Sequence, residues 1–179
     1  AKPASFRPMA DLTVNLFGPV EIFRDSRRPF AADAWTTRRA HDILCFIASR
    51  CHRRASKDTI IETFWGDTDP DFVLRNFHPT VSHIRKALNS NQPLKLNFLL
   101  YRDSAYLLNP ELTYLIDIEE FDRLLAQGEA ARRAKQMDLC ASHFEAAIKL
   151  YRGEFMQGCY DDWAEEQRSY YLEQYLYML

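Results

Sequence analysis

The residues best suited to chemistry lie in one stretch near the middle of the 179-residue chain. At 100° per residue, one side of a helix in this stretch carries cationic and hydrogen-bonding side chains. Its members are Arg75, Asn76, Pro79, Ser82, His83 and Lys86. Arginine and lysine neutralise phosphate, asparagine can pair with adenine, and histidine or serine can reach a base edge or a phosphate oxygen. The stretch predicts a DNA-reading helix, although any solvated helix face has a similar composition.

The apolar side of the same helix is predicted to hold it against the protein. Its members are Leu74, Phe77, Val81, Ile84 and Leu88, spaced by three or four residues. Pro79 donates no backbone hydrogen bond and clashes with the carbonyl of Arg75 in a regular helix. We therefore expect regular helix to begin near Phe77 or His78, with residues 71–76 as a separate turn. A kinked, continuous helix is the alternative.

The flanking segments have the element order of a winged helix. Alternating residues predict antiparallel strands over 12–16 and 20–23, followed by a helix over roughly 38–50 capped by Thr36 or Thr37. A short helix capped by Ser56 is expected to stop at Gly66. A hairpin of residues 94–101 and 105–108 follows the DNA-reading helix, with Arg102, Asp103 and Ser104 at its turn. Arg102 could enter a minor groove or simply be exposed at the turn.

Beyond Pro110 the pattern becomes helical, with helices expected over 117–134, 137–151 and 161–179. Six residues of the first pair match the large and small positions of a tetratricopeptide repeat, namely Leu124, Gly128, Ala131, Cys140, Phe144 and Ala147. A plain helical hairpin is the alternative. The predicted fold is an α+β winged helix-turn-helix domain followed by an all-α tetratricopeptide-like domain. We expect a tail over 1–10 and domains over 11–109 and 110–179.

Charge is divided unevenly along the chain. Residues 1–109 hold 16 Lys and Arg against 11 Asp and Glu, whereas residues 110–179 hold 7 against 14. The first part can face a polyanion and the second would be repelled by one. The chain starts without methionine and stops inside the apolar run 170–179, so we expect a fragment.

Catalytic and cofactor motifs are missing from the sequence. The five glycines form neither a P-loop nor a dinucleotide-binding loop, and there is no GxSxG or HExxH motif. The acidic pairs at 161–162 and 165–166 are better explained as favourable charges at a helix start than as a metal site. The four cysteines lack zinc-ligand spacing and predict free thiols. We expect no enzyme activity, no cofactor, no metal, no membrane contact and a cytoplasmic location.

Two motifs give the chain a family resemblance. Residues 65–67 (Trp-Gly-Asp) and 76–88 resemble the OmpR-type winged helix of Streptomyces antibiotic regulatory proteins, or SARPs. Residues 151–155, followed by Asp162, Trp163 and Arg168, resemble the start of the bacterial transcriptional activator domain of those proteins. The resemblance covers nearly the whole chain from Leu12. It implies a promoter-binding activator that often acts on direct repeats, as a dimer, and contacts RNA polymerase.

The resemblance also implies roles for single residues. Asn76, Pro79 and His83 would face bases, with His78 beside them. Four further positions fall where phosphate contacts are usual: Arg75, Thr80, Ser82 and Arg85. Arg102 and Tyr106 match the Arg and Tyr of the family's RGxGY wing pattern, but Asp103 and Ala105 replace its two glycines. The wing turn is therefore expected to differ in shape.

Two expectations concern protein partners. The loop 66–74 carries Asp67, Asp69 and Asp71, is too acidic for DNA, and is our candidate for a surface that meets RNA polymerase. The alternative function is a protein-interaction module, in which a winged helix that no longer binds DNA is joined to a helical-repeat scaffold. The overall charge of −2 and the altered wing favour that alternative, whereas the cationic helix favours double-stranded DNA.

Overall fold

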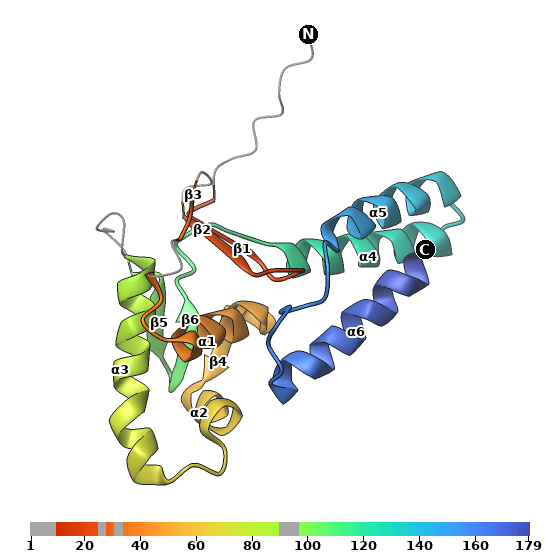
Figure 1. The fold of residues 1–179 in the computed structure, drawn as a ribbon. Helices are drawn as coiled ribbons and strands as arrows, with labels where there is room; N and C mark the ends of the chain where they lie inside the picture. Colours follow the sequence, from red (N-terminus) through yellow and green to blue (C-terminus); the bar gives the residue numbers. More distant parts are fainter. Residues whose placement is uncertain (1–9, 25–27, 31–33, 90–96) are drawn as a thin grey trace.

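The computed structural model describes residues 10–24, 28–30, 34–89 and 97–179 (Figure 1). Within these residues the chain is mixed α+β, with six α-helices and two small β-sheets. Residues 1–9 of the expected tail and residues 94–96 of an expected strand lie outside the described residues.

The first sheet joins the two ends of the N-terminal half. β1 (Leu12–Asn15) and β2 (Glu21–Arg24) form the predicted antiparallel pair, and β2 pairs with β3 (Arg28–Pro29). β7 (Tyr114–Ile116), which the sequence did not predict, adds to β1 in parallel. The expected domain boundary at residue 110 therefore precedes a strand of the N-terminal sheet.

The first two helices begin at the predicted caps. α1 (Arg38–Ser49) starts after Thr37, whose hydroxyl accepts a hydrogen bond from the Ala40 N–H at 3.1 Å. α2 (Lys57–Trp65) starts after Ser56, whose hydroxyl accepts from the Thr59 N–H at 3.0 Å. It ends at Gly66, where φ is 25°, a backbone conformation that glycine adopts most easily. Local capping chemistry was thus sufficient to predict both starts.

The expected break before Pro79 is wrong, because α3 (Pro70–Leu88) is one continuous helix of 19 residues. Asp69 caps it and Pro70 occupies its first turn. A proline inside a helix costs roughly 3 kcal/mol. Burial of a large apolar side chain contributes roughly 1.5–3 kcal/mol, and α3 buries Phe77, Val81, Ile84 and Leu88. The free energy gained by burying this face therefore exceeds the cost of Pro79 inside the helix.

One residue of the predicted apolar face of α3 is wrong, because Val73 is buried in place of Leu74. Leu74 is 71% exposed, whereas its neighbour Val73 is 7% exposed. Because α3 starts at Pro70 and not near Phe77, the buried stripe continues backwards from Phe77 by four residues to Val73. Leu74 is left on the surface.

A second sheet holds the hairpin that follows α3. β5 (Leu99–Arg102) and β6 (Ala105–Leu108) are antiparallel, and β6 also pairs with β4 (Arg54–Ser56), which the sequence did not predict. Only Asp103 and Ser104 form the turn, with φ of 50° and 59°. Two consecutive residues with positive φ are typical of a type I′ hairpin turn. Arg102 therefore ends β5 and is not part of the turn.

The rear helices match the predicted ones closely. They are α4 (Asp117–Arg133), α5 (Met137–Leu150) and α6 (Asp162–Met178). Gly128 lets α4 and α5 approach each other, because a Cβ added there would lie 2.3 Å from Phe144 Cε1. The large and small positions recognised in the sequence thus meet across the helix pair.

One hydrophobic core joins the two halves. The Phe17 ring, after β1, lies 5.2 Å from Phe121 of α4 and 5.1 Å from Tyr171 of α6. Trp163 of α6 packs against Phe46 of α1, with ring centroids 5.2 Å apart. In Figure 1, α6 and α3 lie on opposite sides of α1. The rear half therefore covers the N-terminal half without covering α3.

A buried carboxylate also ties the halves together. Asp117, the first residue of α4, accepts hydrogen bonds from the backbone N–H groups of Leu16 and Phe17 at 2.8–2.9 Å. Burial raises the pKa of Asp117, and these donors oppose the increase. Among the described helices, none is both long and apolar enough to cross a lipid bilayer.

Candidate nucleic-acid interface

The predicted cationic flank of α3 is exposed. Arg75, His78, Pro79, Ser82 and Lys86 are all exposed along the helix. Arg75, Pro79, Ser82 and Lys86 follow steps of four, three and four residues and therefore form one stripe. At 1.5 Å per residue this stripe is roughly 16 Å long, and an α-helix fits the major groove of B-DNA. The structure brings these side chains together on a surface open to a duplex.

Thr80 does not belong to this surface. It is 8% exposed, and its hydroxyl donates to the Asn76 carbonyl at 2.7 Å. The continuous α3 turns Thr80 towards the protein, next to buried Val81. The expectation that Thr80 lies where phosphate can reach it is therefore not met in this structure.

Asn76 is half-buried and already uses a donor. Its amide Nδ2 donates to the Phe72 carbonyl at 2.7 Å, within the same helix. A bidentate contact to adenine needs the amide oxygen and one N–H, and Asn76 keeps both, because its Nδ2 carries a second N–H. Its position beside Arg75 and Pro79 still matches the predicted flank.

His83 and Arg85 lie at the margin of the flank. His83 is half-buried, and its Nδ1 has no hydrogen-bond partner within the described part of the chain. Arg85 is half-buried, and its Nε donates to the Leu99 carbonyl of β5 at 3.4 Å. Arg85 thus leans towards the wing sheet, whereas Arg75 and Lys86 extend into solvent.

The β5–β6 hairpin (Leu99–Leu108), which the sequence predicts as the wing, presents one cation and one anion at its tip. Arg102 and Asp103 are both exposed, at the end of β5 and at the first turn position. Tyr106, the predicted wing tyrosine, is buried and connects the wing to α3, since its ring lies 5.7 Å from Phe77. Burial raises the pKa of Tyr106, which keeps the phenol neutral. The packing of Tyr106 and Phe77 therefore sets the position of Arg102 relative to α3.

Two further cations near the wing were missed by the sequence reasoning. Lys57 places its Nζ 5.3 Å from the Phe77 ring centroid, and its backbone N–H donates to the Ser104 carbonyl at 2.9 Å. Arg54 of β4 donates from Nη2 to the Asp103 carbonyl at 3.3 Å. The pairing of β4 with β6 brings both residues to the wing, and a three-residue strand has no recognisable sequence signal.

Unpaired cations distinguish this surface. None of the ion pairs among the described residues includes Arg75, Lys86, Arg102, Arg54 or Lys57. The segment from Phe72 to Leu88 contains no acidic residue. Within the described part of the chain, these five cations are therefore not neutralised by an ion pair.

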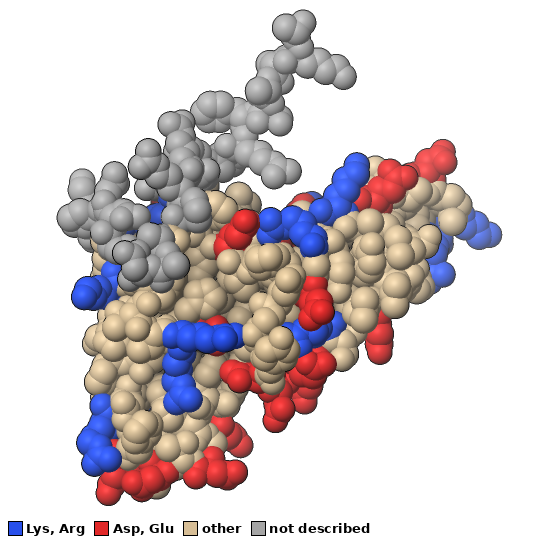
Figure 2. Space-filling model, viewed as in Figure 1, with Lys and Arg blue, Asp and Glu red and all other residues tan. Residues whose placement is uncertain are grey.

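The start of α3 has the opposite charge. Asp67, Asp69 and Asp71 are exposed at the α2–α3 connection, and acidic side chains gather at this end of the molecule (Figure 2). The connection is shorter than the expected loop 66–74, because α3 begins at Pro70. Asp69 also has a structural role, since its carboxylate accepts from the Asp71 N–H at 3.4 Å. Exposed Phe72 and Leu74 lie beside these acids.

Known proteins share parts of this architecture. The family model of the bacterial transcriptional activator domain matches residues 116–179. The regulatory protein AfsR of Streptomyces coelicolor is 26% identical over 93% of this chain, and the regulatory protein DnrI of Streptomyces peucetius is 22% identical over 80%. The chain spans 16% of AfsR and 53% of DnrI.

A solved structure has the same fold. Mycobacterium tuberculosis EmbR, determined in complex with a low-affinity phosphopeptide, superposes with a TM-score of 0.76. The match covers 94% of this chain and 44% of the EmbR chain, at 21% identity. The arrangement of the helices and small sheets is therefore shared with a longer protein.

Proposed function

We propose, since the chain belongs to the SARP-type transcriptional regulators, that residues 11–116 form a winged helix that binds double-stranded DNA in a sequence-specific way. α3 would lie in the major groove, with Arg102 of the wing near the adjacent minor groove. The helical half would follow as a tetratricopeptide-like domain. With DNA as its partner, the protein would act in the bacterial cytoplasm as a transcriptional activator.

One observation supports this proposal above the others. The exposed stripe from Arg75 to Lys86 carries unpaired cations and is left uncovered by the rear half. Arg75, Lys86, Arg85 and the wing cations would neutralise phosphates and release bound counterions. Ser82 and His78 would contribute hydrogen bonds, while Asn76 and His83 would read bases.

A gel-shift measurement on fragments selected from the source genome tests the proposal. Arg75→Ala and Lys86→Ala should each weaken binding to all sequences alike, because phosphate contacts carry no sequence information. Arg133→Ala is the matched control, since Arg133 is an exposed arginine on the helical half and should leave binding unchanged. Equal effects of Arg75→Ala and Arg133→Ala would contradict the assignment of α3 as the DNA-binding helix.

Base readout requires a separate test. Asn76→Ala and His83→Ala should each cost about 1–3 kcal/mol of binding free energy, and only at particular base pairs of the selected site. Binding to single-base variants of that site should show which base pairs are affected. A uniform loss of affinity over all variants would show that these residues contact phosphate or maintain the fold and do not read bases.

The exposed acidic and apolar residues at the start of α3 support a second contact. We propose that Asp67, Asp71 and Phe72 meet RNA polymerase while α3 is on DNA. Asp69 should be left intact, because it caps the helix. Asp67→Lys should preserve DNA affinity and lower transcription per bound molecule, measured in vitro with purified polymerase. Lost DNA affinity with unchanged transcription per bound molecule would contradict this assignment.

The family resemblance also implies how several copies of the chain would be arranged on DNA. We propose that two copies bind adjacent direct repeats. A probe with two repeats should then bind two chains, and a probe with one repeat should bind one, as counted by analytical ultracentrifugation. A single chain on the two-repeat probe would contradict this arrangement.

The rival function is a protein-interaction module, favoured by exposed Phe72 and Leu74 and by Asp103 at the wing tip. The same gel shift separates the two functions. Failure of every genomic fragment to bind at low salt would favour the rival.

A further inference from the structure

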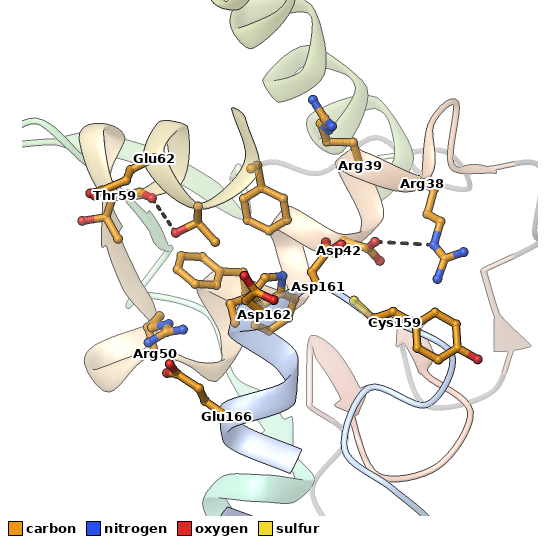
Figure 3. A pocket seen from close by; sticks show the side chains of 15 residues that line it. Arg38, Arg39, Asp42, Arg50, Thr59, Glu62, Cys159, Asp161, Asp162 and Glu166 are labelled. Carbon is orange, nitrogen blue, oxygen red and sulfur yellow. Dashed lines mark hydrogen bonds and ion pairs between the residues drawn. The ribbon is translucent and has the colours of Figure 1, made fainter. Parts of the chain in front are cut away.

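A second cluster of chemically active side chains lies between the two halves, far from the exposed face of α3. Asp42 of α1, Cys159 and Asp161 place one potential ligand atom each within 4.8 Å of one another. Figure 3 shows these three side chains converging between α1 and the segment before α6. The protein reaches this point from two parts of the chain separated by more than a hundred residues.

The cluster differs from an ordinary surface group of acids. Asp42 is 7% exposed and Cys159 is 3% exposed, whereas Asp161 is exposed. Cys45, one turn after Asp42 on α1, is fully buried close to both Asp42 and Cys159, and has no hydrogen-bond partner on another described residue. A buried carboxylate and two buried thiols thus lie together; Asp42 is paired with His41 and Arg38, and the Asp161 backbone N–H is a partner of the Cys159 sulfur.

The neighbouring cation is a movable counter-charge. Arg38 lies 3.6 Å from Asp42, and it also donates a hydrogen bond to the Gly158 carbonyl. It therefore links the same two segments that the cluster joins. The Arg38 side chain is 70% exposed and can swing into solvent. The buried carboxylate would then be available to another cation.

The surroundings also provide a second layer of contacts and an entry route. His41 Nδ1 lies 2.9 Å from Asp42 Oδ1 and fixes the orientation of that carboxylate. All three ligand residues line a groove between α1, α2 and the start of α6, which is open to solvent. A metal ion can therefore reach the cluster without unfolding the protein.

We propose that Asp42, Cys159 and Asp161 form a binding site for a divalent transition-metal ion of the zinc class, which links α1 to the start of α6. Zinc accepts mixed sulfur and carboxylate ligands, with Zn–S near 2.3 Å and Zn–O near 2.0–2.2 Å. In a tetrahedral site two such ligand atoms lie about 3.4–3.6 Å apart, so atoms that now lie within 4.8 Å of one another would close by roughly 1 Å when the ion binds. The ion would take the place of Arg38 beside Asp42, and water would complete its coordination.

Cobalt is a suitable probe, because a cobalt–thiolate bond gives a charge-transfer absorption band that carboxylates alone do not. The full 179-residue chain should bind one Co²⁺ with this band, and Zn²⁺ should displace it. Cys159→Ser should abolish the band, and Asp161→Asn should keep the band but raise the cobalt Kd at least tenfold. Asp161 is exposed, its side chain makes no cap hydrogen bond to α6, and asparagine is an equally good N-cap, so this substitution should leave folding intact.

The other cysteines and Arg38 supply controls. Cys51→Ser removes the exposed thiol, and Cys140→Ser removes a buried thiol on α5; both variants should keep the band and the Kd. Arg38→Ala should tighten cobalt binding, because it removes the competing cation. The proposal is overturned by absence of the band in the unaltered chain, by a band that survives Cys159→Ser, or by a band lost in Cys51→Ser.

Discussion

Arginines on the two sides of the N-terminal half differ in their ion-pair partners. On the side packed against the rear half, arginines meet carboxylates: Arg53 pairs with Glu119 at 2.7 Å, and Arg152 with Glu21 at 3.1 Å. On the α3 side, Arg75 and Arg102 are exposed and take part in none of the ion pairs among the described residues. The same residue type thus helps to join two halves on one side and leaves uncompensated positive charge on the other.

This difference suggests that one side holds the two halves together and that the other side binds a partner. The packed side combines aromatic contacts, such as that between Phe46 and Trp163, with satisfied charges. The α3 side leaves positive charge without an ion pair, which costs self-repulsion and attracts a polyanion. If this division holds, damage to one side should leave the function of the other unchanged.

Trp163→Ala is the strongest test of the packed side. Trp163 is 7% exposed and contacts Phe46 and Phe155. Truncation should lower the free energy of unfolding by about 3–5 kcal/mol, measured by urea denaturation. The folded fraction should keep its DNA affinity. Trp163→Phe is the control and should cost much less, since the indole Nε1 has no partner among the described residues. A loss below 1 kcal/mol for the alanine variant would show that the halves are not held together by this contact.

Gly128→Ala tests the rear half alone. The added Cβ would lie 2.3 Å from a Phe144 ring carbon, so the helix pair must shift. We expect a loss of about 1–3 kcal/mol in the free energy of unfolding, the usual range for overpacking. Gln127→Ala, on the exposed neighbouring position, should have little effect. If the double variant Gly128→Ala/Phe144→Leu regains stability, the loss comes from the clash between the added Cβ and Phe144. Unchanged stability of Gly128→Ala would refute the clash.

Asp103→Asn tests the α3 side by removing the acid next to Arg102. Asparagine tolerates the positive φ of 50° at this turn, so the wing should keep its shape. DNA affinity should rise about two- to fivefold, equivalent to up to roughly 1 kcal/mol for one surface charge. Fluorescence anisotropy at low salt measures the change, which should shrink at high salt. A weaker complex would show that Asp103 contributes to binding.

The last expected effect is a pH dependence within the rear half, where Asp122 of α4 meets Tyr171 of α6. Burial raises the pKa of Asp122 to about 6, against the lowering effect of a hydrogen bond from Tyr171 Oη at 3.2 Å. Since the unfolded carboxyl releases its proton near pH 3.8, the free energy of unfolding should fall as pH rises from about 4 to about 6. Partial exposure limits the change to about 1 kcal/mol. Denaturation of Asp122→Asn over this range should show a smaller decrease, because the pKa of Asp117 is also raised by burial.

Sequence reasoning succeeded where local chemistry decides structure. The caps Thr37 and Ser56 and the stop at Gly66 are set by neighbouring residues, and the three rear helices follow from their periodicity. The resemblance of the rear part to the bacterial transcriptional activator domain was also confirmed, because the model of that family matches residues 116–179. The cationic flank from Arg75 to Lys86 could be located, since it needs only the helical repeat.

Sequence reasoning failed where distant packing decides structure. The continuous α3 depends on contacts of Phe77 and Ile84 with other elements, which a local rule for Pro79 ignores. β4 and β7 exist through pairing with β6 and β1, far along the chain. For the same reason, spacing could not reveal the approach of Asp42 to Cys159.

The salt dependence of DNA binding tests the central proposal most directly. Affinity for a selected genomic fragment should fall with salt at a log–log slope of roughly −4 to −5 if about five phosphates are contacted. The Arg75→Ala/Lys86→Ala variant should reduce the steepness of that slope by about two. An unchanged slope in the variant, or binding that does not respond to salt, would contradict the account that the exposed side of α3 lies on DNA.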